Sequence, residues 1–444
     1  MQRNGFLEHQ KYVKELKWTF CLLALCTTSA FTAASVSLKD CVERARASSL
    51  DMESARLSER SSEASLKTAK TSRNPTVSAS INQTLYDSPL NDASQDHYRL
   101  SLGLTGSYTL WNGGSTGLNI ESKQLSLQAS KYNTELAALN VEESAMNAFV
   151  ALLAAMEDKV TADSALVLSD SLVAYNSRLF DAGTITKSEF SLSKSDAARA
   201  KVSAISAAQA ERSKRTTLRQ ILEMPRTDSL ELNAPEANYA SPTDMGEIPS
   251  FEVVLSETRK HYPVLASDSL SILASQKDLS VAHKNSSISV TLGAQATTGF
   301  QAWESDSYAD QMKDGYTHSL TLGVNIPIID GGTTEAKVLS AQVEAERAQV
   351  TKRETDKTLE NNMEQLYLQA EAADASWLAA IAGVEAAADA FAVATEQRNA
   401  GSITYTDYLE QKNNLQSAKS VLTQAKYTSI LTRSLLDLYM GRYR

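Results

Sequence analysis

Two stretches of the chain alternate between apolar and small polar residues and then change to a helical spacing at a pair of glycines. The first ends in Tyr-Thr-Leu-Trp-Asn-Gly-Gly at 108–114 and the second in Ile-Pro-Ile-Ile-Asp-Gly-Gly at 326–332. A change from period two to a helical period across Gly-Gly predicts a strand that turns directly into a helix. Gly113 and Gly331 lie 218 positions apart, as do Gly183 and Gly401. The chain is therefore expected to contain a duplicated module with a single offset of 218.

Each copy of the module is expected to contain a β-hairpin, at 76–111 in the first copy and at 288–329 in the second. Each strand is predicted to exceed about ten residues, the length that a tilted strand needs to cross a membrane. One side of each strand is apolar, and the other carries mainly Ser, Thr, Gly, Asn and Gln, which suits a water-filled lumen. A soluble β-domain is the alternative, because period two is common to both.

Aromatic residues gather at the ends of the predicted strands. Such clusters are typical of the interfacial girdles of outer-membrane barrels. The residues are Tyr108 and Trp111 at one end, and Tyr86, Tyr98, Phe300, Trp303 and Tyr316 at the other.

Long segments with a seven-residue apolar repeat follow both glycine pairs. Helices are expected at 114–182 and 332–400, and a sustained heptad repeat predicts left-handed coiled coils. Shorter helices are expected to return at 186–224 and 404–440. The repeat positions are Leu118, Leu125, Tyr132, Leu139, Met146, Leu153, Val160 and Val167 in the first copy, and Leu359, Leu366, Ala373, Ala380, Ala387 and Ala394 beside Met363, Ala370, Trp377, Val384 and Phe391 in the second.

The duplication divides the chain into a first repeat at 35–250 and a second repeat at 251–444. Helices at 37–73 and 251–285 are expected to open the two repeats. Segment 225–250 holds four of the eight prolines of the chain and is expected to be an irregular linker.

Residues 1–34 have the pattern of a secretory signal peptide, in which three lysines precede a short apolar core and small residues follow. The apolar core is too short for a membrane-spanning helix. Thr32-Ala33-Ala34 and Thr28-Ser29-Ala30 both offer a cleavage site, and we expect cleavage after Ala34. Lipidation of Cys26 is the alternative, and the bulky Leu25 before it disfavours that alternative.

Removal of this leader changes the charge and the cysteine content. The chain has 43 Lys and Arg against 53 Asp and Glu, and loss of four basic and two acidic residues leaves 39 against 51, a net charge of −12. An acidic chain of this kind is not expected to bind nucleic acid. Cys41 would be the one cysteine left, and its place in the first helix predicts a small buried residue rather than a reactive one.

These elements predict an α+β membrane protein with internal duplication. Long antiparallel coiled-coil helices are expected to form an α-barrel, and the four strands are expected to contribute to a shared transmembrane β-barrel. An open sheet edge cannot lie in lipid, and single-chain membrane barrels begin at about eight strands. The chain is therefore expected to oligomerise and to contact outer-membrane lipid.

The duplicated halves resemble the TolC family of outer-membrane efflux proteins. The resemblance is carried by the corners at 111–114 and 329–332 and by the Ala-Gly-x-Ile-Thr turns at 182–186 and 400–404. It implies a homotrimer with a twelve-stranded barrel in the cell outer membrane and a helical tunnel in the periplasm. It also implies two partners, a periplasmic adaptor (membrane fusion protein) and an inner-membrane transporter of the RND, ABC or MFS type. Such a channel conducts substrates passively in a tripartite efflux or type I secretion system.

Two groups of residues are candidate sites beyond the sheet. The strand–helix corners comprise Asn112, Gly113, Gly114, Asp330, Gly331 and Gly332. At the helical tips, glycine is expected to end one helix and threonine to cap the next. The resemblance implies that the same tips dock the adaptor: Gly183, Thr184, Ile185, Thr186, Gly401, Ser402, Ile403 and Thr404.

The resemblance also implies a periplasmic gate near the tips, at Glu189, Arg398, Asp407 and Glu410. Asp407 and Glu410 lie three residues apart on one helix face, which is also typical of a solvated acidic helix start. Family members with a closed mouth carry an arginine two residues after the second tip glycine, where this chain has Ile403. We expect Glu189 and Arg398 to pair in the closed mouth instead.

No Ser-His-Asp, Cys-His, metal-binding or phosphate-loop pattern occurs in the sequence, so we expect neither an enzyme nor a cofactor. A secreted coiled-coil scaffold or adhesin without a channel is the alternative function. A periplasmic adaptor would have a single helical hairpin and a single small β-domain. The substrate, whether a drug, a metal ion or a protein, is left open, because the pump selects it.

Overall fold

A computed structural model gives the fold of most of the 444-residue chain. The predicted leader and Trp303 lie outside the described residues, which are 36–86, 97–226, 230–302 and 304–442.

The chain divides into two compact units. Unit 1 contains residues 1–44 and 148–240, and unit 2 contains residues 45–147 and 241–444. These units do not follow the two sequence repeats, because the first repeat contributes residues to both. The repeat boundaries remain a prediction about the duplication.

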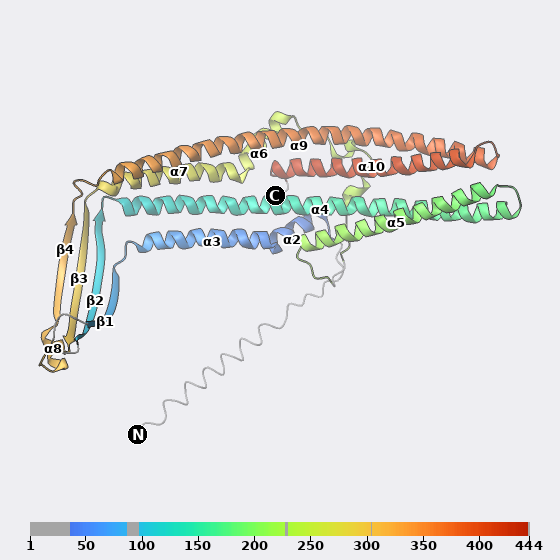
Figure 1. Ribbon diagram of the computed structural model, residues 1–444. Helices are drawn as coiled ribbons and strands as arrows, with labels where there is room; N and C mark the ends of the chain where they lie inside the picture. The colour runs from blue at the N-terminus through green and yellow to red at the C-terminus, as the bar shows by residue number, and fades with distance from the viewer. Residues whose placement is uncertain (1–35, 87–96, 227–229, 303, 443–444) are drawn as a thin grey trace, which may run out of the picture. The chain divides into compact units, whose positions relative to one another are not determined.

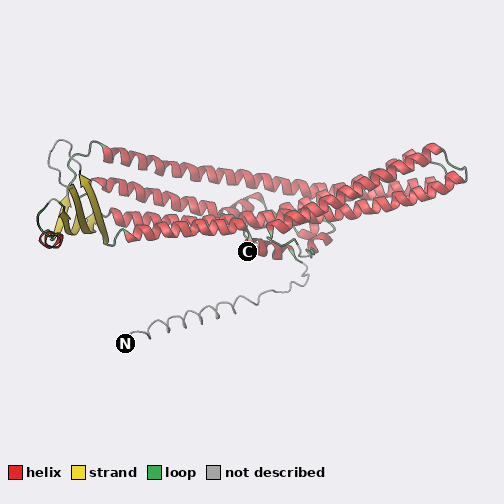
Figure 2. Ribbon diagram, turned by 60° about the horizontal axis from the view of Figure 1, so that its bottom comes forward, coloured by secondary structure: helices red, strands yellow, loops and turns green. Residues whose placement is uncertain are grey.

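Unit 2 contains an antiparallel four-stranded sheet in the order β1-β2-β3-β4. Figure 1 shows these strands side by side, with α3 and α7 leading into β1 and β3 and α4 and α9 following β2 and β4. Figure 2 shows the helices leaving the sheet from one end. The elements are α3 (Leu50–Thr71), β1 (Thr76–Tyr86), β2 (His97–Asn112), α4 (Ser115–Asp181, which continues into unit 1), α6 (Phe251–His261), α7 (Pro263–His283), β3 (Ser289–Gln301), α8 (Tyr308–Asp314), β4 (Thr317–Asn325), α9 (Thr333–Asn399) and α10 (Tyr405–Tyr439).

Unit 1 holds a helical hairpin and a short connecting segment. The hairpin consists of the second part of α4 and of α5 (Lys187–Ile221), and α2 (Leu38–Ser48) begins in the same unit. Val36 forms a parallel bridge with Leu232, so the start of the described chain is fixed to the predicted linker. The predicted α+β class with internal duplication is confirmed.

Helix lengths show that the duplication has two offsets rather than one. α2 begins at Leu38 and α6 at Phe251, 213 positions later, and both helices have 11 residues. α4 and α9 both have 67 residues, and α5 and α10 both have 35, at an offset of 218. A single offset of 218 is therefore wrong for the first part of the module. The longer hairpin loop of the second repeat, which contains α8, accounts for the difference.

Helices predicted as continuous at 37–73 and 251–285 are each broken at the equivalent place. Ser49 separates α2 from α3, and its side chain accepts a hydrogen bond from the backbone N–H of Asp51. Tyr262 separates α6 from α7, and Pro263 begins α7. A proline is tolerated in the first turn of a helix but cannot continue an earlier one.

Strand β4 is shorter than predicted, with nine residues against 11, 16 and 13 in the other strands. It ends at Asn325, although alternation continues to residue 329. Pro327 has no N–H to donate to a ladder, and it restricts the residue before it. The prediction of a hairpin at 288–329 is therefore too long at its end.

The predicted heptad positions are buried along most of α9. Leu359, Met363 and Trp377 are each at most 3% exposed. In the first copy the prediction fails towards the tip, where Val160 and Val167 are 65% and 66% exposed. A straight helix rotates by about 20° per heptad relative to an exact seven-residue repeat, so a long stripe moves away from its neighbour.

Cys41 is fully buried in α2, as predicted. Burial raises the pKa of its thiol to about 12. Because the thiolate is the reactive form, Cys41 is expected to be inert in the folded protein.

We predict that a water-soluble maleimide labels Cys41 of the processed chain slowly. The reference is a Ser58→Cys variant in a Cys41→Ser background, which should be labelled at least about 100-fold faster. The reason is that the reactivity of a thiol depends on its ionisation and on its access to solvent. Ser58 is exposed on α3. In denaturant the two rates should become equal. Rapid labelling of native Cys41 would contradict its burial.

Candidate functional site

The register of the sheet places apolar residues side by side on one face. Ile81 lies opposite Leu102, and Leu102 lies opposite Thr298. Ile81, Leu320 and Leu322 are 70%, 74% and 63% exposed. Soluble proteins rarely expose a contiguous apolar surface of this kind, so the exposure favours contact with lipid.

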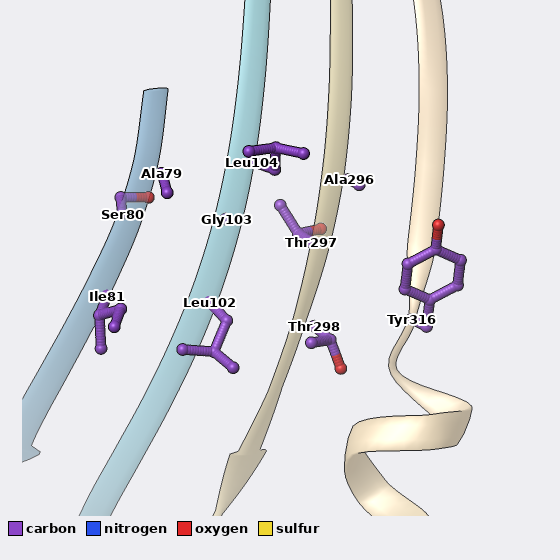
Figure 3. Close-up of a pocket in the computed structure, with 10 residues that line it drawn as sticks. All are labelled: Ala79, Ser80, Ile81, Leu102, Gly103, Leu104, Ala296, Thr297, Thr298 and Tyr316. Carbon is purple, nitrogen blue, oxygen red and sulfur yellow. The ribbon is translucent and has the colours of Figure 1, made fainter. Parts of the chain in front are cut away.

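Figure 3 shows the middle of this face, where Ile81 and Leu102 lie beside each other and Tyr316 stands at the start of β4. A shallow hollow of about 340 Å³ lies here. Ser80 and Thr297 alternate with the apolar positions, and they flank Gly103 on the neighbouring strand. The two faces therefore differ in chemistry as the alternation predicts.

Both Gly-Gly corners have the same backbone conformation. Gly113 and Gly114 have φ of +67° and +84°, and Gly331 and Gly332 have φ of +62° and +81°. These values lie in the left-handed region, which glycine adopts without steric cost. Two consecutive left-handed residues turn the chain out of the strand direction and into the long helix.

The residue before each glycine pair caps the helix that follows. Asn112 Oδ1 accepts a hydrogen bond from the backbone N–H of Thr116 at 3.3 Å, and Asn112 Nδ2 donates to Thr116 Oγ1 at 2.7 Å. In the second copy Asp330 accepts from the N–H groups of Gly332 at 3.1 Å and Thr334 at 2.9 Å. Hydrogen bonds from Thr334 hold the pKa of the Asp330 carboxyl below its ordinary value. A short polar side chain is therefore needed here to satisfy the first N–H groups of the helix.

Each tip ends its long helix at a left-handed glycine, as predicted. Gly183 and Gly401 have φ of +73° and +70°. Their N–H groups donate to the carbonyl oxygens of Phe180 at 2.9 Å and Arg398 at 3.0 Å. The next N–H groups complete a Schellman motif: Thr184 to Leu179 O at 2.9 Å, and Ser402 to Gln397 O at 2.8 Å.

Threonine caps the returning helix at both tips, as predicted. Thr186 Oγ1 accepts from the N–H of Glu189 at 3.2 Å, and Glu189 Oε2 accepts from the N–H of Thr186 at 3.1 Å. At the second tip Thr404 Oγ1 accepts from the N–H of Asp407 at 3.2 Å. Most tip residues are exposed, and Ile185 and Ile403 are half-buried.

The two tips differ in the side chains that hold their helices together. In the first tip the rings of Phe180 and Phe190 stack with their centroids 5.2 Å apart. The positions 218 later hold Arg398 and Tyr408. The Arg398 guanidinium lies 4.3 Å from the ring centroid of Tyr405 and 5.7 Å from that of Tyr408. An aromatic pair in one repeat is therefore replaced by cation–π contacts in the other.

Sequence reasoning missed this aromatic cluster. Tyr405 and Tyr408 are 1% and 3% exposed, and Tyr408 also packs against Phe391 with ring centroids 5.5 Å apart. When the two repeats are aligned at the offset of 218, Phe180 is equivalent to Arg398. This difference in the sequence could have indicated that the second tip has different side-chain contacts.

The predicted gate residues occupy the two tips. Asp407 and Glu410 are exposed, and Glu189 and Arg398 are half-buried. Glu189 takes part in the cap of α5, and Arg398 contacts the Tyr405 ring. Pairing of Glu189 with Arg398 remains a prediction. Among the residues that the structure describes, no group of three or more His, Cys, Asp or Glu side chains is arranged to hold a metal ion.

Comparison with known proteins agrees with this architecture. A family model described as "Outer membrane efflux protein" matches residues 41–223 and 254–442. The outer membrane efflux protein BepC of Brucella suis biovar 1 (strain 1330) is 31% identical over 131 residues, a match that covers 30% of this chain and 29% of that relative. The chain thus matches less than a third of the length of this relative.

Two solved structures have the same fold along almost the whole chain. The open state of the MtrE outer membrane channel of Neisseria gonorrhoeae gives a TM-score of 0.74 at 17% identity, covering 94% of this chain and 93% of that chain. The outer membrane protein VceC of Vibrio cholerae gives 0.72 at 16% identity, covering 91% and 96%. Family and fold are thus those of channel proteins rather than enzymes. The chain belongs to the outer membrane efflux protein family, and it is located in the outer membrane with its helical part in the periplasm.

Proposed function

We propose that three copies of this chain form one passive channel, in which each copy contributes four strands to a closed barrel in the outer membrane and its long helices to a shared tunnel. Substrates enter from a periplasmic adaptor and an inner-membrane transporter, in tripartite efflux or type I secretion. The chain itself supplies a path and a gate, and the pump supplies the energy and selects the substrate.

The exposed apolar face of the sheet is the observation that carries this proposal. In the described chain the outer strands β1 and β4 each have a neighbour on one side. A sheet can lie in lipid only when it is closed, because unsatisfied backbone groups are costly there. Further copies of the same chain would complete the barrel without a second kind of subunit. Such an assembly has the closed symmetry that most homo-oligomers have.

The tips support the proposed docking of the adaptor. Schellman motifs and threonine caps satisfy the backbone groups at both helix ends and fix the shape of each tip. The tip residues remain exposed apart from half-buried isoleucines. A rigid, exposed tip of small residues suits a partner that approaches the backbone closely.

We predict that Leu102→Arg and Leu322→Arg each abolish assembly in the outer membrane, at a cost of about 2–4 kcal/mol for an arginine near mid-bilayer. Ser101→Arg and Ser319→Arg, on the opposite face, are the matched controls and should assemble with altered conductance. The measurement is the fraction of heat- and SDS-resistant oligomer in the outer-membrane fraction. Equal behaviour of the two sets would refute the barrel, and a soluble rod shed from cells would favour a scaffold.

We predict that Gly183→Pro or Gly401→Pro uncouples transport while the oligomer remains in the membrane. Proline cannot adopt a positive φ and lacks the N–H that each glycine donates at the tip. Gly383→Ala is the control, because Gly383 lies within α9 and no other part of the chain lies within 4 Å of the Cβ that alanine would add. Substrate export and chemical crosslinking of Ser402→Cys to the adaptor are the readouts. Normal export by both proline variants would place docking elsewhere.

We predict that Arg398→Ala raises the open probability of single channels in planar bilayers, because it removes the cation–π contacts that hold the second tip. Arg398→Lys keeps the charge without the planar stacking group and should have a smaller effect. Asp407→Ala with Glu410→Ala should weaken cation preference, because rings of carboxylates attract cations. Unchanged conductance in all three variants would move the gate elsewhere.

A further inference from the structure

A short helix, α8, lies in the connection between β3 and β4. Figure 1 shows it at the end of the sheet away from the beginnings of α4 and α9. We call this end of the sheet the outer end. Because the helical part of the chain lies in the periplasm, the outer end faces the outer leaflet and the cell exterior. Contacts of α8 with the sheet can therefore show where the contact with lipid stops.

α8 is fixed to the last residues of β3 by a ring contact and a side-chain hydrogen bond. The rings of Tyr308 and Phe300 stack with their centroids 4.5 Å apart. Gln311 Oε1 accepts a hydrogen bond from the backbone N–H of Gln301 at 2.8 Å. Phe300 lies opposite Leu100, so it belongs to the apolar face of the sheet. The helix is thus held against that face and not against the polar one.

Strand β3 continues towards the outer end beyond the start of β4. Their register ends where Thr297 lies opposite Thr317, whereas β3 runs on to Gln301. Within the described chain, the last residues of β3 thus have α8 on this side in place of a partner strand, and Gln311 supplies the acceptor for one N–H. Backbone groups at such a strand end are costly in hydrocarbon but can bind water outside it.

Hydrogen-bonding side chains on the apolar face lie near the same end. Thr298 and His318 belong to this face, because they lie opposite Leu102 and Ala296. The Thr298 hydroxyl donates a hydrogen bond to the carbonyl oxygen of Met312 in α8. Closer to the periplasm, the residues of β3 and its start on this face are all apolar. They are Ile288, Val290, Leu292, Ala294 and Ala296.

The height of this apolar stretch agrees with that of a hydrocarbon layer. Ile288 and Thr298 are ten residues apart, which is about 33 Å along a strand at about 3.3 Å per residue. In a barrel whose strands tilt by about 40°, this length spans about 25 Å, the height of the apolar band of outer-membrane barrels. A stretch that continued to Gln301 would span about 33 Å and would be taller than the band.

The side of α8 that faces away from the sheet is polar. Asp310, Lys313 and Asp314 are exposed, whereas Gln311 and Met312 are half-buried. Charged side chains on the lipid-facing surface of a barrel are destabilising near the middle of the bilayer and are tolerated near its interfaces. The charges of α8 therefore suit hydrated lipid headgroups and not acyl chains.

We propose that α8 lies in the headgroup layer of the outer leaflet and ends the lipid-facing surface of the barrel. Hydrocarbon contacts the apolar face from Ile288 up to the level of Thr298, and α8 covers the part of β3 above that level. This inference rests on the proposed barrel and adds the outer limit of its contact with lipid.

Two tyrosines lie at the proposed boundary. Thr298 and Tyr316 line the same hollow and lie beside each other in Figure 3. Tyr308 and Tyr316 are 55% and 56% exposed. Tyrosine is favoured at a membrane–water interface, where its ring is in apolar surroundings and its hydroxyl reaches water.

The depth of α8 is tested with an environment-sensitive fluorophore on single cysteines in a Cys41→Ser background. Asp310→Cys places the fluorophore on the outward side of α8. Leu320→Cys is the matched control, because Leu320 lies on the apolar face and is 74% exposed. Processed oligomers are reconstituted in phosphatidylcholine vesicles that carry a nitroxide quencher either on the headgroup or near the end of an acyl chain.

We expect the headgroup nitroxide to quench the Asp310→Cys label at least about threefold more than the acyl-chain nitroxide does, because the headgroups and the bilayer centre are about 15 Å apart. The Leu320→Cys label should show the opposite preference. Preferential acyl-chain quenching of both labels would overturn the placement of α8 and leave the barrel standing, as would an Asp310→Cys label that only iodide in the water reaches. A Leu320→Cys label that neither nitroxide quenches would refute the barrel, and this inference with it.

The contacts that hold α8 on the sheet have a separate test in the Asp310→Cys variant. Tyr308→Ala together with Thr298→Val removes the ring stack and the hydrogen bond to α8. Quenching by the headgroup nitroxide should then fall at least about twofold, because these contacts fix the helix to β3. Thr291→Val, on the polar face of the same strand, is the control and should leave the quenching unchanged. Equal quenching in both variants would contradict the role of these contacts.

Discussion

Backbone N–H and C=O groups on the outer edges of β1 and β4 need hydrogen-bond partners wherever the sheet lies in lipid, because the bilayer core supplies none. Antiparallel pairing satisfies the inner edges of the four strands. The exposed apolar face is expected to contact lipid, and the edge strands are expected to pair with further strands. In the proposed channel, further copies of the chain meet both requirements by closing the barrel, just as β2–β3 pairing joins the two hairpins inside the chain.

Strand positions also determine where the helices run. Each long helix begins directly after a glycine pair, so the positions of the ends of β2 and β4 fix where α4 and α9 begin. Asn112 and Asp330 cap these helices through Thr116 and Thr334, which satisfies the first N–H groups at the corner. The sheet thereby continues into the long helices without a flexible linker between them.

Duplication gives the chain two tips with the same backbone and different side chains. Both tips use a Schellman glycine and a threonine cap. Phe180 stacks on Phe190 in one tip, whereas Arg398 lies over Tyr405 in the other. An aromatic stack does not depend on charge, whereas a cation–π contact responds to nearby charges. If the proposed channel has a gate at its tips, this difference favours the second tip.

The sequence by itself determined the strand faces, the glycine corners, the tip caps and much of the heptad seam of α9. Each of these depends on local periodicity or on the backbone preference of one residue, which neighbouring residues in the sequence reveal. Only the tertiary structure showed the offset of 213 and the contact of Arg398 with Tyr405. These features depend on which segments lie side by side, and distant packing leaves no period in the sequence from which it can be read.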